Sequence, residues 1–355
     1  MERATRCIPI PTAKRFVKQC IVAGGAKEVH AQAMADTLIA ADHRGHFSHG
    51  LNRLEMYVKD IQTGSTVGDG EPVTLKESAA TAHVDGKNNL GPVVGNYCMK
   101  LAIKKAKECG VGWVVAKGSN HYGIAGFYAL QAVEEGLVGF SFTNTTPCVK
   151  ANRSYDFTLG TNPIACAAPA IDKDAFVLDM ATSTVSSGKV EMNGRKGIPI
   201  PNGWGADPNG RETNEPSEVL NGGGLLPLGG AEESGGYKGY GLAMMVEMLC
   251  GILGGGAYGP NVRKWGTTSR EANLGQCFIA LNPDMFCDGF GERMQDLMDS
   301  QRNLTPSEKD KPVLVAGDPE RMHIKKCEEL GGIPYPTNVV DHMNGLAKEL
   351  GVKPM

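Results

Sequence analysis

The sequence predicts an α/β protein, because segments with the apolar spacing of helices alternate with short apolar segments typical of buried strands. The clearest helix is Val93–Cys109, where apolar residues between Met99 and Ala106 recur at i, i+3, i+4 and i+7 while Lys and Glu face outward. A short strand at Val111–Ala116 follows directly. The length of 355 residues allows one large domain or two closely joined domains.

Helices and strands alternate through the first half of the chain. Residues 12–42 have the apolar spacing of two helices, and Arg53 to Ile61 forms a third, which Gly64 ends. Alternating apolar residues at 73–84 predict strands. A further helix is expected at 124–135, and further strands at 138–142, 163–168 and 176–181.

A segment rich in glycine, proline and asparagine interrupts this alternation at residues 194–236, and we expect it to form loops. Regular elements then resume. They are helices at 239–253, 291–301, 319–330 and 339–350, and strands at 276–281 and 313–316.

The composition indicates a small-molecule partner. A net charge of −3 with 21% charged residues provides no basic patch for nucleic acid. The 10 cysteines occur singly, without a C-x-x-C pair, which is typical of reduced thiols in a cytosolic protein. No apolar run approaches about 18 residues, and the first residues lack the apolar core of a signal peptide. We therefore expect a cytoplasmic protein that binds neither nucleic acid nor a membrane.

The segment from Arg44 to Tyr57 is the most informative for function. If the chain is helical after Gly50, then His49, Arg53 and Tyr57 lie four residues apart on one face. An imidazole, a guanidinium and a phenol together suit a small 2-oxo or 2-hydroxy acid, which needs a proton donor, a carboxylate clamp and an orienting hydroxyl.

A packed helix with solvent-facing polar residues is the alternative for this segment, because Leu51, Leu54 and Val58 supply an apolar face. A metal site is not expected. His43 and His46 precede His49, but no carboxylate or cysteine follows at ligand spacing on the segment.

His121 follows a buried strand and precedes a helix, which is a common place for reactive side chains in α/β proteins. Its ordinary pKa lies near neutral pH, so it is a candidate general acid or base. The alternative is a histidine that caps the following helix.

Two more polar clusters come at strand ends. Thr143, Asn144 and Thr145 could hydrogen-bond a ribose, a carboxamide or a pyrophosphate, or could only satisfy their own backbone in a turn. Asp179 ends an apolar strand and is followed by the segment Met180, Ala181, Thr182. A carboxylate there needs a partner, such as an imidazole or a backbone N–H, and capping of a helix is the plain alternative.

Lys238 and Gly239 lie at the start of an expected helix, where a cation and small residues suit a phosphate, although a flexible loop with an exposed lysine would give the same pattern. Gly317 and Asp318 form a turn before another helix and could be no more than its cap. The sequence contains neither a P-loop nor a G-x-G-x-x-G after a strand.

Five motifs in order carry a family resemblance. They are Arg44-Gly-His-x-Ser-His-Gly, Ser119-Asn-His-Tyr-Gly, Leu159-Gly-Thr-Asn-Pro-Ile-Ala, Asp179-Met-Ala-Thr-Ser and Lys238-Gly-Tyr-Gly-Leu. Together they resemble the type-2 malate/L-lactate dehydrogenase family, which also includes sulfolactate and ureidoglycolate dehydrogenases, diketogulonate reductase and cyclic-imine reductases. The matches extend from about residue 12 to residue 350, which is nearly the whole chain.

This resemblance implies a homodimeric oxidoreductase that uses NAD or NADP and has a non-Rossmann α/β fold of the sulfolactate/malate dehydrogenase type, with helical N- and C-terminal segments. His49 and His121 match the histidines that transfer the proton or polarise the substrate, with Asp179 able to orient either. Ser48, Arg53 and Tyr57 match positions on the substrate side. The segments expected to contact the dinucleotide include Thr143, Asn144, Thr145, Asp179, Met180, Ala181, Thr182, Lys238, Gly239, Gly317 and Asp318. Tyr237 departs from the family, which often has histidine there, and this puts the role of Lys238 in doubt.

We expect residues 1–75 and 320–355 to form helical segments for substrate binding and dimerisation, and residues 76–319 to form the dinucleotide-binding domain. The expected reaction is hydride transfer between nicotinamide and C2 of a small 2-hydroxy or 2-oxo acid. Reduction of a cyclic imine is the alternative reaction, and a dinucleotide-binding homologue without turnover is the alternative outside catalysis. The sequence leaves open which histidine moves the proton and whether NAD or NADP is preferred.

Overall fold

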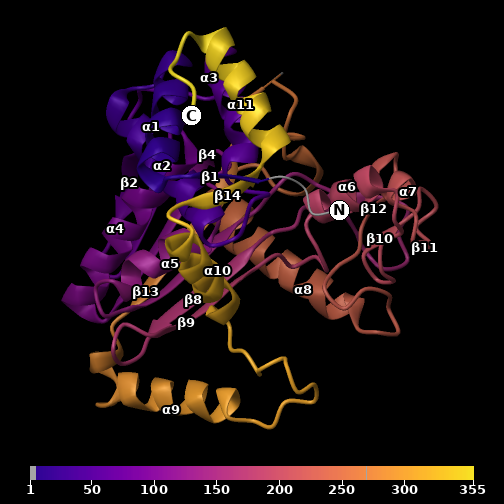
Figure 1. Cartoon of the computed structure of the whole chain (residues 1–355). Coiled ribbons are helices and arrows are strands. Elements are labelled where there is room, and N and C mark those ends of the chain that lie inside the picture. The colour runs from indigo at the N-terminus through magenta and orange to yellow at the C-terminus, as the bar shows by residue number, and fades with distance from the viewer. Residues whose placement is uncertain (1–4, 269) are drawn as a thin grey trace.

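A computed structural model describes residues 5–268 and 270–355. Its central element is a seven-stranded sheet with the order β2-β3-β4-β13-β5-β8-β9 (Figure 1). The strands of this sheet are β2 (Val73–Glu77), β3 (Thr81–Asp85), β4 (Val111–Ser119), β5 (Val138–Thr143), β8 (Ile164–Pro169), β9 (Ala175–Met180) and β13 (Leu274–Leu281). The α/β fold class is confirmed.

The sheet is mostly antiparallel: β3 and β4 pair in parallel, and the other five neighbouring pairs are antiparallel. A Rossmann fold requires consecutive parallel strands with a switch point between them. The missing glycine fingerprint is therefore explained by a different topology.

Helices cover both faces of this sheet. The helices in chain order are α1 (Ile10–Ala23), α2 (Glu28–His43), α3 (Leu54–Gln62), α4 (Gly91–Cys109), α5 (Gly126–Val133), α6 (Ser187–Lys196), α7 (Pro216–Leu220), α8 (Gly236–Glu247), α9 (Phe290–Arg302), α10 (Asp318–Glu329) and α11 (Thr337–Leu350). Met99 of α4 and Tyr128 of α5 belong to one buried cluster with Phe278 of β13, whereas Val246 of α8 packs with Cys277 of the same strand. Alternate residues of β13 thus serve the two faces, as the strand period requires.

Helix α4 begins with a proline in its first turn and ends at Gly110, which adopts the left-handed conformation (φ 89°) of a helix C-cap. The helix lies very close to the strand that follows it. A Cβ on Gly112 would lie 1.9 Å from the carbonyl oxygen of Ala102, so only glycine fits there.

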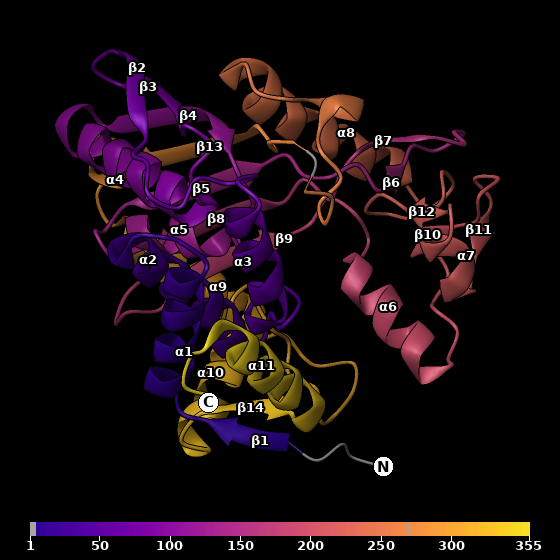
Figure 2. The ribbon, with the colours of Figure 1, turned by 90° about the horizontal axis from the view of Figure 1, so that it is seen from above.

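The two ends of the chain pack together. Strands β1 (Thr5–Ile8) and β14 (Ile333–Pro336) form an antiparallel pair that the sequence pattern did not predict. Helices α1, α2, α3 and α11 share one hydrophobic cluster, which includes Phe16, Leu38 and Met343. In Figure 2 the first and last parts of the chain, indigo and yellow, lie side by side.

The predicted loop region at residues 194–236 is instead part of a small second sheet with the order β11-β10-β12-β6-β7. Its strands are β6 (Val149–Lys150), β7 (Phe157–Leu159), β10 (Gly205–Ala206), β11 (Glu212–Thr213) and β12 (Gly224–Leu225). Strands of two or three residues are too short to show a period of two, so the pattern could not reveal them. This sheet lies with α6 and α7 to one side of the main body in both views (Figures 1 and 2).

The strand expected at 313–316 was wrong, whereas residues 239–253 are helical as expected. Residues 313–316 form no strand, although the N–H of Val177 donates to the carbonyl of Ala316 at 3.0 Å. The apolar segment after α8 continues as a π-helix, Met248–Ile252. No helix in the described part of the chain combines the length and apolar character that crossing a bilayer requires.

Candidate active site

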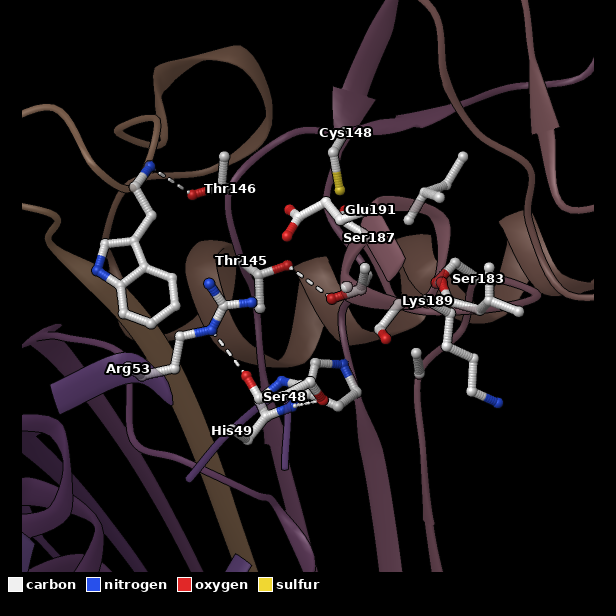
Figure 3. A pocket seen from close by; sticks show the side chains of 18 of the residues that line it. Ser48, His49, Arg53, Thr145, Thr146, Cys148, Ser183, Ser187, Lys189 and Glu191 are labelled. Atoms are coloured by element: carbon white, nitrogen blue, oxygen red, sulfur yellow. Dashed lines mark hydrogen bonds between the residues drawn. The ribbon is translucent and has the colours of Figure 1, made fainter. Parts of the chain in front are cut away.

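A cavity of about 1810 Å³ opens beside the main sheet. Its walls come from the loop after α2, the ends of β5 and β9, helix α6 and the loop that contains Trp265 (Figure 3). It is lined by Ser48, His49, Arg53 and His121, so four of the residues predicted for the substrate site share one space. Tyr57, which was predicted with them, does not line the cavity.

The loop of residues 44–53, called the substrate loop below, is fixed by a buried carboxylate. Asp42 Oδ2 accepts hydrogen bonds from the N–H of Leu51 (2.8 Å) and from the hydroxyl of Tyr335 (2.7 Å). A Cβ on Gly50 would lie 1.9 Å from Asp42 Oδ1, so glycine is required where the loop crosses this carboxylate. Burial raises the pKa of Asp42 to about 7, against the lowering effect of these two hydrogen bonds.

The expected single helical face does not form. Leu51–Arg53 is a turn of 3₁₀ helix, α3 begins at Leu54, and His49 lies in the preceding turn. The reason is the capture of the Leu51 N–H by Asp42, which starts the helix in a tighter turn. His49 and Tyr57 approach each other through their contacts with His121 instead.

His121 contacts three aromatic rings, those of His49, Tyr57 and Trp265. Its Nδ1 is 2.5 Å from the Tyr57 hydroxyl and 3.3 Å from the N–H of Gly123. A backbone N–H can only donate, so Nδ1 accepts, the Tyr57 hydroxyl donates and the proton of the neutral ring is on Nε2. Burial, followed by repulsion from the protonated form of His49 and from Arg53, holds the pKa of His121 well below its usual value. Burial also raises the pKa of Tyr57, which keeps the phenol protonated.

His49 faces His121 in a roughly parallel arrangement, with ring centroids 5.7 Å apart. Its Nδ1 lies 2.8 Å from the hydroxyl of Ser48. Burial lowers the pKa of His49 to about 4, and the neighbouring Arg53 adds to this effect. Both histidines are therefore neutral at pH 7.

Arg53 is held by its Nε, which donates to the carbonyl oxygen of Ser48 at 2.7 Å. No hydrogen bond from residues 5–268 or 270–355 occupies its two terminal nitrogens, so the fork is available to a carboxylate.

Trp265 was not expected from the sequence and lines the cavity beside Arg53. Its ring stacks on His121 with centroids 4.0 Å apart, and the guanidinium carbon of Arg53 lies 5.5 Å from its centroid. The backbone N–H of Trp265 donates to Thr146 Oγ1 at 2.9 Å. A lone tryptophan in a loop has no recognisable motif, so no sequence signal marked it.

Of the residues expected to contact the dinucleotide, five line the cavity. They are Thr143, Thr145, Asp179, Met180 and Ala181. Asn144 and Thr182 lie behind this wall. The Thr182 hydroxyl donates to the carbonyls of Thr161 and Asn162, both at 3.0 Å, and so holds a neighbouring loop.

Asp179 orients neither histidine in this structure. Its Oδ2 accepts from the N–H of Gly126, the first residue of α5, at 2.8 Å. This contact caps the helix, which was the plain alternative at the sequence level. Burial raises the pKa of Asp179, while the nearby His46 opposes the increase.

Lys238 and Gly239 do not line the cavity. Lys238 is exposed on α8, with its ammonium 5.9 Å from the Tyr237 ring centroid. Gly239 is buried against the backbone of Leu228, where a Cβ would lie 2.3 Å from the carbonyl oxygen. The glycine thus allows α8 to pack closely against this segment.

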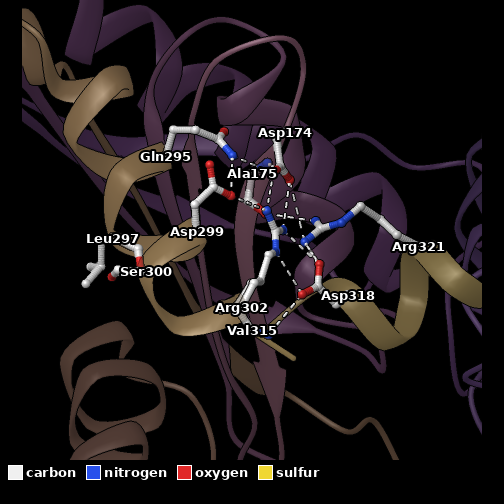
Figure 4. A network of polar contacts seen from close by, with 10 residues as sticks. All are labelled: Asp174, Ala175, Gln295, Leu297, Asp299, Ser300, Arg302, Val315, Asp318 and Arg321. Carbon is white, nitrogen blue, oxygen red and sulfur yellow. Dashed lines mark hydrogen bonds and ion pairs between the residues drawn. The ribbon is translucent and has the colours of Figure 1, made fainter. Parts of the chain in front are cut away.

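Gly317 and Asp318 also lie outside the cavity. Asp318 belongs to an ion-pair network that joins β9, α9 and α10 (Figure 4). Arg302 contacts Asp318 at 2.8 Å and Asp174 at 2.7 Å, and Arg321 contacts Asp318 at 2.5 Å. Burial alone would raise the pKa of Asp318, but its hydrogen bonds with Arg302, Val315 and Arg321 hold the pKa below its usual range.

Helix α6 supplies lining residues that the sequence analysis missed. Ser187 and Lys189 come from its first turn and Arg195 and Lys196 from its last. Together with Arg53 and Lys264, the cations Lys189, Arg195 and Lys196 outnumber the lining carboxylates Asp179 and Glu191. Arg263 also lines the cavity but is paired with the buried Asp60 at 2.8 Å. The cavity therefore favours an anionic ligand.

Comparisons with known proteins identify the family of the chain. Residues 8–344 match the sequence profile of the malate/L-lactate dehydrogenase family. The chain is similar to malate dehydrogenase of Pyrococcus horikoshii, with 41% identity over 341 residues that span 95% of this chain and 94% of that protein. It is 36% identical to L-sulfolactate dehydrogenase of Methanocaldococcus jannaschii over 96% of each chain. The crystal structure of malate dehydrogenase from Entamoeba histolytica superposes with a TM-score of 0.93 at 32% identity, covering 99% of both chains.

The resemblance predicted from the five sequence motifs is confirmed by these matches along nearly the whole length of the chain. The chain belongs to the malate/L-lactate dehydrogenase family, and it is an oxidoreductase that acts on the CH–OH group of a hydroxy acid.

Proposed function

We propose that the enzyme transfers a hydride between nicotinamide and C2 of a small 2-hydroxy or 2-oxo acid of the malate or L-lactate type. The observation that carries this proposal is that the free fork of Arg53 and the ring of His121 line the same cavity. Arg53 binds the carboxylate of the acid in two parallel hydrogen bonds, and the oxygen on C2 lies at Nε2 of His121. A 2-oxo acid carries these two functions on adjacent carbons.

His121 is proposed as the group that holds and moves the proton, because Tyr57 occupies Nδ1 and leaves Nε2 for the substrate. When the proton of the neutral ring is on Nε2, the Tyr57 hydroxyl donates to Nδ1, and when it is on Nδ1, the same hydroxyl accepts from Nδ1–H. In the second tautomer Nε2 takes the proton of the hydroxy acid, and Nε2–H of the charged ring returns it to the 2-oxo acid. The histidine can therefore change its charge without changing its position. His49 and Ser48 lie next to it and orient the substrate.

The residues present fit a dinucleotide. The cavity exceeds the roughly 300–1,000 Å³ that is typical for drug-sized ligands, so it has room for a second, larger molecule beside a small acid. Its donor set combines the hydroxyls of Thr145 and Ser187 with the cations of α6, which suits ribose and phosphate groups. The Thr143 hydroxyl donates to the backbone carbonyls of Asn144 and Gly275 instead. NAD or NADP, when bound, supplies the hydride donor or acceptor.

We propose that Thr143, Thr145, Asp179, Met180 and Ala181 contact this cofactor directly. Asn144 and Thr182 support the wall from behind. The other four expected residues lie outside the cavity: Lys238, Gly239, Gly317 and Asp318. They would contact the cofactor only after a change in the conformation of the chain, or across the interface with a second subunit.

A homodimer in the cytoplasm is the proposed assembly. Exposed apolar side chains along α8 and the π-helix, including Met244, Met248 and Ile252, support an interface. Residues 1–75 and 320–355 are proposed to form the substrate-side and dimerisation segments, and residues 76–319 the dinucleotide-binding domain. Size-exclusion chromatography with light scattering checks the assembly, and a monomeric mass would contradict it.

The function is tested by following NADH and NADPH oxidation at 340 nm with oxaloacetate, pyruvate and 2-oxoglutarate, and separately with cyclic imino acids. We expect turnover with a 2-oxo acid. Turnover with the cyclic imines alone would replace the proposed reaction by imine reduction. Binding of a dinucleotide without oxidation by any compound in the panel would identify a homologue that lacks turnover.

A further inference from the structure

Glu247 is a buried carboxylate that the proposed chemistry does not use. It is the last residue of α8 and only 5% exposed. No lysine, arginine or histidine among the described residues forms an ion pair with it. A buried charge without a counter-ion requires strong hydrogen bonds in compensation.

Three donors from three different segments provide that compensation. Oε1 accepts from the side-chain amide of Asn144 at 2.9 Å and from the N–H of Gly259 at 3.0 Å. Oε2 accepts from the side-chain amide of Asn162 at 2.7 Å. One carboxylate therefore joins the segment after β5, the segment before β8 and the loop after the π-helix.

Neither asparagine side chain can flip its amide to swap the positions of Oδ1 and Nδ2. Asn144 Oδ1 already accepts from the N–H of Gly275, and Asn162 Oδ1 accepts from the N–H of Thr145, both at 3.0 Å. Each amide must therefore present its NH₂ group to Glu247. Both terminal atoms of the side chain at position 247 must therefore be hydrogen-bond acceptors, which only a carboxylate provides.

The same bonds lead directly to the cavity wall. Asn162, held by Glu247, fixes the backbone of Thr145, which lines the cavity together with Thr143 and Thr161. Asn162 adopts a positive φ of 30°, a conformation that costs energy for a residue with a side chain and persists only when its surroundings hold it.

The π-helix that begins after Glu247 brings its backbone close to this hub. A Cβ on Gly251 would lie 2.8 Å from the Asn144 amide nitrogen and 2.7 Å from the carbonyl oxygen of Ala257. Single π-turns inside helices often occur at functional sites. Here the π-turn places Gly251, near the end of the helix, between the side chain of Asn144 and the loop that contains Ala257.

We propose that Glu247 is a positioning residue that sets the cofactor-side wall of the cavity through Asn144 and Asn162, without contacting cofactor or substrate. This inference rests on the proposed function, because it assumes that Thr143 and Thr145 contact the dinucleotide. Its consequence is selective: loss of the carboxylate weakens dinucleotide binding and leaves the binding of the 2-oxo acid by Arg53 intact.

The test is Glu247→Gln, which keeps the size of the side chain but presents an NH₂ group to one of the two fixed amide donors. We expect the dissociation constant for NADH or NADPH, measured by fluorescence titration, to rise about tenfold or more, the effect of losing a hydrogen bond to a charged group. The KM for the 2-oxo acid at saturating cofactor should stay within about twofold of wild type.

Asp174→Asn is the matched control, because Asp174 is a partly buried carboxylate of the ion-pair network and does not line the cavity. It should lower the melting temperature without changing the dissociation constant of the dinucleotide. If Glu247→Gln does not fold, Asn162→Ser removes one arm of the hub and should give the same selective loss.

Unchanged dinucleotide binding in Glu247→Gln would overturn the proposal. The proposal would also be overturned if both Glu247→Gln and Asp174→Asn lost dinucleotide binding in proportion to their loss of melting temperature. A residue with a merely structural role would give that result. Wild-type protein that binds neither NADH nor NADPH would refute the proposed function itself, and with it the role of Glu247 as a cofactor-side residue.

Discussion

The Tyr57 hydroxyl lies 2.5 Å from Nδ1 of His121, and this contact determines which nitrogen of the histidine faces chemistry. Tyr57 comes from α3 and His121 from the segment after β4, 64 residues later in the chain. Because burial keeps the phenol protonated, the pair acts as a fixed donor and acceptor in the resting enzyme.

The first prediction concerns proton transfer. His121→Asn should lower kcat/KM by about 100- to 10,000-fold, the usual contribution of general acid–base catalysis, whereas His49→Asn should have a smaller effect on kcat. Tyr57→Phe keeps the ring but removes the donor to Nδ1, and should lower kcat/KM by about tenfold or more. Near wild-type kcat/KM in His121→Asn would rule out this role.

The pH dependence of hydroxy-acid oxidation follows from the same pair. The neutral form of His121 accepts the proton at Nε2 when the ring proton is on Nδ1. Its pKa is held well below the usual value by burial, and by repulsion from Arg53 and from the protonated form of His49. Oxidation should therefore stay high as the pH falls through 6.5, the ordinary histidine pKa, and decline only at more acidic pH. A profile of kcat/KM against pH with its acidic midpoint at or above pH 7 would contradict this assignment.

The second prediction concerns the carboxylate clamp. Arg53→Lys keeps the positive charge but cannot form two parallel hydrogen bonds, so the KM for the 2-oxo acid should rise about 10- to 100-fold. Arg293→Lys on the exposed helix α9 is the control and should leave the kinetics unchanged. An equal KM in the wild type and Arg53→Lys would mean that another cation binds the substrate.

The third prediction concerns the stability of the substrate loop. The folded-state pKa of Asp42 is raised from 3.8 to about 7, so the folded protein binds one more proton than the unfolded chain between these values. The free energy of unfolding therefore decreases as the pH rises through this window, by about 4 kcal/mol in total at about 1.4 kcal/mol per unit.

Asp42→Asn removes this ionisation while its side-chain oxygen can still accept from Leu51 and Tyr335. Its melting temperature relative to wild type should increase between pH 4 and pH 8, as measured by calorimetry. Asp36→Asn, on the same helix and half-exposed beside Lys14, is the control and should show no such trend. A difference between Asp42→Asn and wild type that does not vary with pH would contradict the raised pKa.

The fourth prediction separates stability from cofactor binding at Asp318. Arg302→Ala should lower the free energy of unfolding by about 2 kcal/mol at pH 7, because it removes charge-assisted hydrogen bonds to Asp174 and Asp318. The pKa of Asp318 is lowered in the folded state, so this stabilisation is present above the unfolded pKa and is lost as the pH falls through the folded pKa.

The difference between Arg302→Ala and wild type in urea unfolding should accordingly shrink in acid. Lys311→Ala, which breaks an exposed pair with Glu308, is the control and should cost less than about 1 kcal/mol. If Arg302→Ala weakens dinucleotide binding at a temperature where it is fully folded, then Asp318 also serves the cofactor, as the family resemblance implied.

The sequence predicted which polar groups line the cavity better than it predicted the contacts that bring them together. His49, Arg53 and His121 were identified because they stand in motifs and at strand or helix ends. Their meeting depends on Asp42, which captures the Leu51 N–H, and on Trp265, which stacks on His121. Such contacts join residues up to 293 positions apart, as in Asp42 and Tyr335, and no local pattern encodes them.

Small elements escaped prediction for a different reason. Strands β10 and β12 have two residues each, so their pairing is decided by neighbouring chain segments and not by their own alternation. At Asp318 the sequence predicted a cofactor contact where the structure has an ion pair with Arg302. A turn before a helix has the same sequence pattern whether its carboxylate binds a ligand or an arginine.

The pairing of β1 with β14 has a consequence for the order in which the protein can assemble during synthesis. The helices that bear the substrate loop are translated about 270 residues before Tyr335 and α11, which complete their core. Their apolar surface therefore stays uncovered until these later segments have emerged from the ribosome. Ribosome-bound chains that end before residue 333 should bind chaperones through this surface, and the substrate loop should become ordered only once Tyr335 can reach Asp42.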